Sequence, residues 1–167
     1  MALVKSLKSL KSANSVFFDT SVLVAGTIDF GPPSVASLKV LGAFAREGVG
    51  PPLTAWHCCL EFYAVTTRLP PEYRLCPAQA LQVLEDDVLR KWRVSDLSEA
   101  HRASFLGTLS GERVVGGRLY DAHIAAIAHA SGAATVVTEN RRHFTSLMRY
   151  GIRVLDAAEI AREMGLK

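Results

Sequence analysis

Short apolar runs alternate with longer helix-like stretches along most of this chain, and that alternation restricts the folds open to it. Consecutive strand-like runs are separated by helices rather than joined by two-residue turns, so they need crossover connections. The strand-like runs are 16–18, 92–94, 134–138 and 152–154. Helices are expected over about 34–46, 55–67, 77–89, 98–109, 118–130 and 157–164. The pattern predicts an α/β fold with an open, mainly parallel sheet of about four or five strands and helices on both faces, a three-layer sandwich.

Two neighbouring segments fit this pattern less simply. The pair Leu53-Thr54 is too short to be assigned as a strand from sequence. The helix expected over 55–67 is apolar nearly all round, which is typical of a helix in the interior of a protein.

The size and composition favour one domain. The chain has 167 residues, of which 49% are hydrophobic and 21% charged, enough apolar material for a core. We expect residues 15–167 to form that domain. Residues 1–14 contain lysines spaced among leucines and no acid, which indicates a basic amphipathic or disordered arm. A net charge of +3 is compatible with nucleic-acid binding but too small to argue for it alone.

Cysteine usage and hydropathy bear on the compartment. Cys58, Cys59 and Cys76 have neither a metal-binding spacing nor an even-numbered disulfide framework, which favours a reducing environment. No apolar stretch reaches the ~20 residues that span a bilayer, and the start of the chain lacks the apolar core of a signal peptide. We therefore expect a cytoplasmic protein without membrane association.

Three acids stand inside apolar segments that are far apart in sequence. Asp19 ends the run 16–18, Glu61 interrupts the helix 55–67, and Asp121 begins the apolar part of the helix 118–130. Removing an ionised carboxylate from water costs several kcal/mol or more unless it is paired. By themselves, Asp19 could be a helix cap and Asp121 could complement a helix dipole. Glu61 has apolar helical neighbours, so it is expected to face the interior.

A divalent cation would make the approach of these acids tolerable. Mg²⁺ and Mn²⁺ take oxygen ligands and require no local spacing, because separate elements can deliver them. Such an ion also stabilises charge on a phosphodiester and acidifies water, so the cluster suits hydrolytic cleavage. A polar rim is expected at the turn after the strand 134–138, where Asn140, Arg141, Arg142 and His143 would bind phosphate.

These segments, in this order, resemble the PIN domain family, and specifically the VapC-type toxins of bacterial and archaeal toxin–antitoxin pairs. The resemblance covers about residue 15 to the end of the chain. Besides the helix around Glu61, the matching segments are VFFDTSVLVA (16–25), LYDAHIAAIA (119–128), VVTENRRHF (136–144) and YGIRVL (150–155).

The resemblance implies a metal-dependent endoribonuclease. Asp19, Glu61 and Asp121 would hold Mg²⁺ or Mn²⁺ and activate water, while Thr20, Ser21 and Thr138 would orient them. Many members have an aspartate where this chain has Asn140, so the side of a second ion loses a charge, and Glu139 is the residue that could compensate. Substrate contacts are assigned to Arg118, Asn140, Arg141, Arg142 and His143. The implied partners are RNA, a small antitoxin protein and a second copy in a homodimer.

Other functions are compatible with parts of this pattern. A housekeeping RNA-processing nuclease of the same family would present the same acids, and a non-catalytic scaffold that binds RNA or protein is conceivable because of Asn140. A haloacid-dehalogenase-like phosphatase also has an aspartate after its first strand, but that chemistry needs a second aspartate where Ser21 stands.

Overall fold

The computed structural model describes residues 15–46 and 51–166. Within them, one five-stranded sheet has the order β3-β2-β1-β4-β5, and every neighbouring pair is parallel. The strands are β1 (Val16–Phe18), β2 (Leu53–Ala55), β3 (Arg93–Ser95), β4 (Thr135–Val137) and β5 (Arg153–Leu155). The predicted fold class is confirmed, and β2 is the strand that could not be assigned from sequence.

The central strands are apolar because both faces of the sheet are covered. All residues of β1, β2 and β4 are buried, whereas the edge strands β3 and β5 are partly exposed. Phe17 lies between Leu53 of β2 and Val136 of β4 in the register. A continuous apolar run is typical of a parallel strand covered on both faces, which explains why 16–18 was recognisable as a strand.

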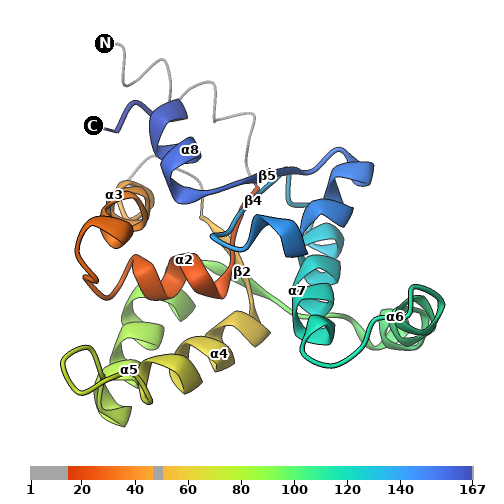
Figure 1. Ribbon diagram of the computed structural model, residues 1–167, viewed down its shortest axis with the longest axis horizontal. Coiled ribbons are helices and arrows are strands. Elements are labelled where there is room, and N and C mark those ends of the chain that lie inside the picture. The colour runs from red at the N-terminus through yellow and green to blue at the C-terminus, as the bar shows by residue number, and fades with distance from the viewer. Residues whose placement is uncertain (1–14, 47–50, 167) are drawn as a thin grey trace.

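Helices pack on both faces of this sheet. Figure 1 shows α3 and α8 on one side and α6 and α7 on the other. The α-helices are α2 (Thr20–Ala25), α3 (Val35–Phe44), α4 (Trp56–Thr66), α5 (Pro77–Val83), α6 (Glu99–Gly111), α7 (Arg118–Ala130) and α8 (Ala157–Glu163). Shorter helical segments are η2 (Pro32–Ser34), η3 (Leu84–Leu89), η4 (Arg141–His143) and η5 (Thr145–Tyr150).

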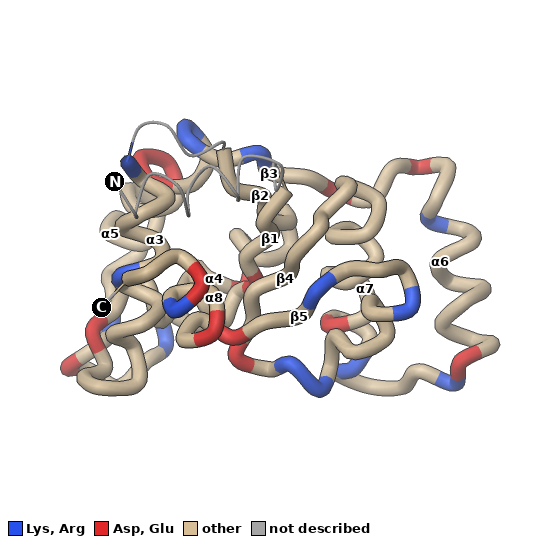
Figure 2. Tube along the Cα trace, turned by 90° about the horizontal axis from the view of Figure 1, so that it is seen from above, with Lys and Arg blue, Asp and Glu red and all other residues tan. Residues whose placement is uncertain are grey.

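Helix α7 packs firmly, and α6 does not. The buried residues of α7, Ile124, Ala125, Ile127 and Ala128, recur at the spacing of one helix face. None of the residues of α6 is buried. Both views place α6 at one end of the molecule, outside α7 (Figures 1 and 2). The position of Asp121 in the first turn of α7 is therefore set by a helix anchored in the core.

The expectation that helix 55–67 lies in the interior all round is wrong. Cys58 and Phe62 of α4 are buried, but Trp56, Leu60 and Tyr63 are exposed. These three side chains fall on one face because their spacing follows the helical repeat. The helix packs on α2, α5 and β2, which cover only part of its surface.

Three further sequence expectations concern membrane association, charge and the N-terminal arm. None of the helices in the described segments combines the length and apolarity needed to cross a bilayer. Basic and acidic positions are interspersed along the trace in Figure 2, in keeping with the small net charge. The arm predicted over 1–14 lies outside the described residues.

Candidate active site

Asp19 lies at the carboxyl end of β1, where β1 passes into α2. Its backbone N–H donates to the carbonyl oxygen of Val137 at the end of β4, 3.0 Å away, so the ends of the two central strands are joined here. The side chain is only 3% exposed. Asp19 occupies the N-cap position of α2, but its carboxylate makes no capping hydrogen bond to that helix. The carboxylate of Asp19 therefore does not serve as a helix cap.

Two hydroxyl groups hold the Asp19 carboxylate. Ser21 Oγ and Thr138 Oγ1 each donate to Asp19 Oδ2 at 2.8 Å. Each hydroxyl oxygen also accepts a backbone N–H at 3.0 Å, Ser21 from Glu139 and Thr138 from Asn140. Because the backbone donors occupy one lone pair of each hydroxyl, the hydroxyl protons are free to point at Asp19. The turn after β4 thus fixes the orientation of an acid at the end of β1.

The electrostatic environment of Asp19 disfavours its charge. Burial raises the pKa of this carboxyl above its ordinary value, and the hydrogen bonds from Ser21 and Thr138 lower it in part. The nearby charge of Glu61 raises the pKa further. A cation in front of Asp19 would reverse the balance by favouring the ionised form.

Glu61 is held at the cavity by a hydrogen bond from α2. Thr20 Oγ1 donates to Glu61 Oε2 at 2.6 Å. Nε2 of His57, one helical turn earlier, lies 3.9 Å from Glu61 Oε1, too far for a hydrogen bond. The Glu61 side chain is 38% exposed, so it faces the cavity rather than the interior that its helical neighbours suggested.

Asp121 is paired with a histidine from the other side of the site. His143 Nδ1, on η4, lies 2.8 Å from Asp121 Oδ2. Arg142 Nε donates to His143 Nε2 at 3.1 Å. An imidazole that accepts at Nε2 carries its proton on Nδ1, which is the tautomer that donates to Asp121. The structure therefore makes His143 a positioning partner of Asp121, in addition to the phosphate contact assigned from sequence.

The three acids open onto one cavity of about 300 Å³. Among the described residues, its wall contains no lysine or arginine. The wall is formed by Asp19, Thr20, Ser21, Val24, Ala25, Phe30, Glu61, Val65, Asp121 and Asn140. In the described segments no three acidic, histidine or cysteine side chains form a closed set of metal ligands. Glu61 is instead bonded by Thr20 and Asp121 is paired with His143, so the three acids line one cavity without forming a ready set of metal ligands.

The oxygen-rich wall suits a hard divalent cation. Asp19, Glu61 and Asp121 offer carboxylate oxygens and Asn140 offers an amide oxygen, the ligand types that Mg²⁺ and Mn²⁺ take. A buried carboxylate whose charge is disfavoured, beside two other acids and without a basic side chain in the wall, is electrostatically matched to such an ion. These four residues are the ones that could hold it.

Of the residues predicted to contact the substrate, some line the cavity and others point away from it. Asn140 lines the cavity. Arg141 is turned to α8, where its Nη1 lies 2.8 Å from Glu159 Oε1 and 4.0 Å from Asp156 Oδ2. Arg118 is exposed at the first position of α7.

Glu139 contributes through its backbone rather than its carboxylate. Its N–H supports Ser21, as described above, while its Oε1 accepts a hydrogen bond from the N–H of Ala157 at 3.3 Å. The carboxylate therefore lies at the start of α8 and is absent from the cavity wall. In this arrangement, the Glu139 carboxylate does not supply the negative charge that is missing at Asn140.

The sequence reasoning missed the apolar part of the wall. Val24 and Ala25 on α2 and Val65 on α4 are half-buried, and Phe30 reaches the cavity from the loop before η2. The helical spacing of Val65 from Glu61 was a usable signal. Phe30 had no such signal in the sequence, because the side chains of a loop do not follow a regular spacing.

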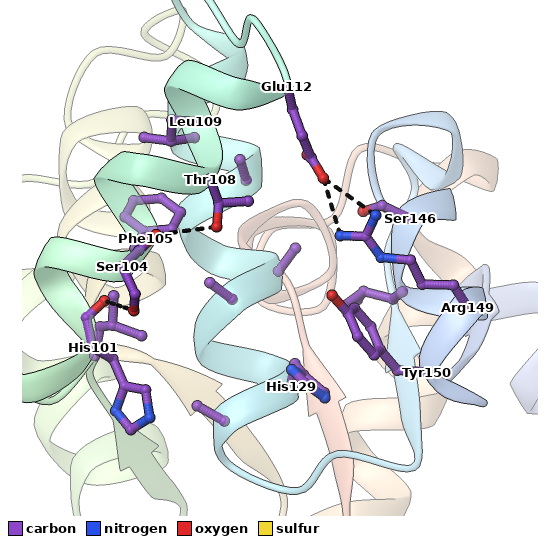
Figure 3. Close-up of a pocket in the computed structure, with 16 residues that line it drawn as sticks. His101, Ser104, Phe105, Thr108, Leu109, Glu112, His129, Ser146, Arg149 and Tyr150 are labelled. Atoms are coloured by element: carbon purple, nitrogen blue, oxygen red, sulfur yellow. Dashed lines mark hydrogen bonds and ion pairs between the residues drawn. The ribbon is translucent and has the colours of Figure 1, made fainter.

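A second cavity of about 330 Å³ lies between α6, α7 and η5 (Figure 3), and none of the predicted site residues lines it. Arg149 donates to Glu112 Oε1 through both terminal nitrogens, at 3.1 and 3.2 Å. The rings of His129 and Tyr150 stack with centroids 4.0 Å apart. Its one acid, Glu112, is already paired with Arg149, so it holds no cluster of acids comparable with the first cavity.

Comparison with known proteins identifies the fold family. The model of the PIN domain family matches residues 16–148, a span that contains all three acids and the turn after β4. The chain belongs to the PIN domain family. This confirms the resemblance found in the sequence.

A curated relative covers most of the chain. Ribonuclease VapC40 of Mycobacterium tuberculosis (strain CDC 1551 / Oshkosh) is 33% identical over 126 residues, which are 74% of this chain and 85% of the relative. The PIN domain described here is thus similar in sequence to proteins named as VapC ribonucleases.

Solved structures share the fold. Mycobacterium tuberculosis VapC20, titled a sarcin-ricin loop cleaving toxin, has a TM-score of 0.55 and 17% identity, and the likeness covers 73% of this chain and 87% of that one. VapBC-1 from nontypeable Haemophilus influenzae has a TM-score of 0.56 and 14% identity, covering 86% and 98%. At these identities the comparison concerns the fold alone.

Proposed function

We propose that this PIN domain is a metal-dependent endoribonuclease that hydrolyses RNA phosphodiester bonds, and that it is the toxin of a toxin–antitoxin pair. One observation supports the activity above the others. Acids delivered by three separate elements, Asp19, Glu61 and Asp121, line a single cavity whose described wall has no basic side chain. The sequence similarity to VapC40, which is named a ribonuclease, supports RNA as the substrate.

Each residue of the site has a role that follows from its contacts. Bound Mg²⁺ or Mn²⁺ would supply positive charge that stabilises the developing charge on the phosphate and acidifies a water molecule. Asp19, Glu61 and Asp121 would hold the ion and orient the water. Ser21 and Thr138 keep Asp19 aligned, and His143 keeps Asp121 aligned. The apolar Val24 and Phe30 limit the access of bulk water on one side.

The test is cleavage of labelled RNA by the purified protein. With Mg²⁺ or Mn²⁺ we expect cleavage, which stops when the ions are chelated and resumes when they are added back. Asp19→Asn and Asp121→Asn should each lower the rate by at least ~100-fold, because each removes a carboxylate that would hold the cation which stabilises charge on the reacting phosphate. Circular dichroism establishes that the variants are folded.

A matched control distinguishes the loss of an active-site acid from a general loss of one negative charge. Glu72 is an exposed acid outside the cavity wall, and Glu72→Gln makes the same change of charge. This variant should cleave like the wild type. Folded Asp19→Asn protein with undiminished cleavage would show that the acid cavity is not the active site, whereas a wild type that binds RNA without cleaving it in Mg²⁺ or Mn²⁺ would favour the scaffold alternative.

The partner proposals follow from the family resemblance. A small antitoxin would occupy the acid cavity and abolish cleavage, and the likeness to VapBC-1, whose name joins two components, supports a protein partner. The protein would encounter both RNA and the antitoxin in the cytoplasm, which is the location that we propose for it. Expression with the product of an adjacent small reading frame should yield a stable complex without nuclease activity. Light scattering of the isolated protein tests the homodimer, and recovery of a monomer alone would exclude it.

A further inference from the structure

Tyr120 is a large exposed aromatic beside the acid cavity. It lies in the first turn of α7, immediately before Asp121, and 52% of it is exposed. Core packing does not account for a ring in this position, because the apolar face of α7 that enters the core begins at Ile124. Single exposed aromatics are common on protein surfaces, so the surroundings of the ring decide what it can do.

The ring of Tyr120 is held in place by a second ring. His57 of α4 stacks on it, with centroids 5.4 Å apart and planes 28° from parallel. His57 is supported in turn by an edge contact with His123 at 5.3 Å. One face of Tyr120 is therefore backed by a side chain anchored on a different helix, while half of the residue stays in solvent. An aromatic fixed in this way loses little side-chain entropy when a flat ligand binds it.

The stack begins at the wall of the cavity. His57 Nε2 lies 3.9 Å from Glu61 Oε1, so the order in space is Glu61, His57 and Tyr120. A nucleotide bound next to the acids faces an electrostatic difficulty. The described wall has no lysine or arginine, and its carboxylates repel the phosphates of RNA until a cation is bound. Affinity from an uncharged contact close to the acids would avoid this repulsion.

We propose that Tyr120 is a stacking platform for one nucleobase of single-stranded RNA beside the phosphate that is cleaved. The inference rests on the proposed function and names how its substrate is held. Base–aromatic stacking tolerates any base, because every base has a flat face. Tyr120 therefore selects an unpaired nucleotide rather than a sequence, and a paired base is excluded unless its helix opens.

The other candidate for this surface is a second copy of the chain. The exposed Trp56, Leu60 and Tyr63 of α4 form an apolar stripe on the helix that carries His57. A protein interface would bury Tyr120 through general apolar contact and would not require its ring to be backed by an imidazole. The stack and its continuity with Glu61 favour a nucleobase. The second copy becomes an outcome of the test.

The experiment compares three variants in Mn²⁺-dependent cleavage of a short unstructured RNA. Tyr120→Leu should raise KM about 5- to 100-fold, the range expected for one lost base stack, with a smaller change in kcat. Tyr120→Phe keeps the ring and should remain within about twofold of the wild type. Tyr150→Leu is the matched control: Tyr150 is also exposed and stacked on a histidine, His129, but at the second cavity (Figure 3). It should not change KM.

Abasic substitutions in the RNA identify the contact directly. For the wild type, removal of one particular base should weaken binding by the same factor as Tyr120→Leu, whereas the variant should not respond to that removal. Equal KM values for Tyr120→Leu and the wild type would overturn the inference while leaving the nuclease intact. A change in KM that accompanies a change of oligomeric state in light scattering would assign the surface to a second copy and also overturn it. If the wild type neither cleaves nor binds the RNA, the proposed function fails first.

Discussion

The hydroxyl of Thr138 donates a hydrogen bond to Oδ2 of Asp19 at 2.8 Å, across a separation of 119 positions in the sequence. Asp19 follows β1 and Thr138 follows β4, and the two strands are neighbours in the sheet. Thr138 therefore serves the site because a parallel sheet brings the carboxyl ends of adjacent strands together.

Thr138→Val removes this hydroxyl and keeps the shape of the side chain. Cleavage should fall about 10- to 100-fold, the usual cost of losing a group that orients a metal ligand. High Mn²⁺ concentration should recover the lost cleavage if the hydroxyl acts through ion affinity. The control is Thr108→Val on α6, which lies outside the acid cavity. Unchanged cleavage by folded Thr138→Val protein would contradict the orienting role.

Asp19 makes the stability of the metal-free protein depend on pH. Burial holds its pKa in the folded protein above the ordinary value of about 3.8. The folded state consequently binds its proton more tightly than the unfolded state, and stability falls as pH rises from that value through the folded pKa. In the presence of chelator, Asp19→Asn should melt at a higher temperature than the wild type, with a difference that grows with pH and then levels off.

Thermal denaturation measures the difference in melting temperature between Asp19→Asn and the wild type, and also how far added Mn²⁺ reduces that difference. A gain of about 1 kcal/mol corresponds to ~2–4 °C at this chain length. Added Mn²⁺ should raise the melting temperature of the wild type and have little effect on Asp19→Asn. A difference between the two proteins that does not vary with pH would show that the charge of Asp19 is not its source.

His143 should act through Asp121. His143→Ala leaves Asp121 without its partner at 2.8 Å, and kcat is expected to fall about tenfold or more. His143→Asn places an amide N–H near the position of Nδ1 and should recover part of the loss. His101→Ala is the control, because His101 is exposed on α6 and bonds to Ser98. A rise in KM alone for His143→Ala would indicate a phosphate contact instead.

Arg118 and Arg141 offer a matched pair for the phosphate contacts predicted from sequence. Arg141 is engaged by Glu159 on α8 and by Asp156 at its N-cap, whereas Arg118 is exposed at the first position of α7. Arg118→Ala should weaken RNA binding and lower the slope of log Kd against log salt by about 1, the value for one phosphate contact. Arg141→Ala makes the same change of charge and should leave the slope nearly unchanged. Equal slopes for the two variants would contradict this division.

The cysteines report on the packing around Asp19. Burial raises the pKa of the Cys58 thiol to about 12, with a further contribution from the charge of Asp19, and burial raises that of Cys59 to about 11. Cys76 is exposed. Because the thiolate is the reactive form, iodoacetamide at pH 8 should modify the native protein at Cys76 only. Mass spectrometry should find one adduct before denaturation and three after it. Rapid modification of native Cys58 would contradict the packing of α4 on α2.

Much of the fold could be predicted because its signals are local. The apolar run at β1 and the helix Arg118–Ala130 were predicted with the bounds that the structure has. β2 could not be assigned, because its register with Phe17 of β1 and with β3 is what makes it a strand. The exposed side of α4 was missed because hydropathy describes side chains, not how many neighbouring elements cover a helix.

The site was predictable in its residues and not in its contacts. Asp19, Glu61 and Asp121 were detectable because an acid in an apolar segment is costly unless something compensates it. Nothing in the sequence relates His143 to Asp121, turns Arg141 toward α8, or directs the carboxylate of Glu139 to Ala157. Those three contacts depend on the backbone and side-chain conformation of the turn after β4, which the sequence does not specify.

By itself, the sequence determined the alternation of strands and helices and the presence of three acids in apolar surroundings, because both follow from the hydropathy of neighbouring residues. Only the tertiary structure decided that Thr138 and Ser21 share one oxygen of Asp19 and that Tyr120 rests on His57. These contacts join segments that are distant in the chain. Their geometry exists only after the parallel sheet has brought its strand ends to one edge and the core has fixed the rotation of α4 and α7.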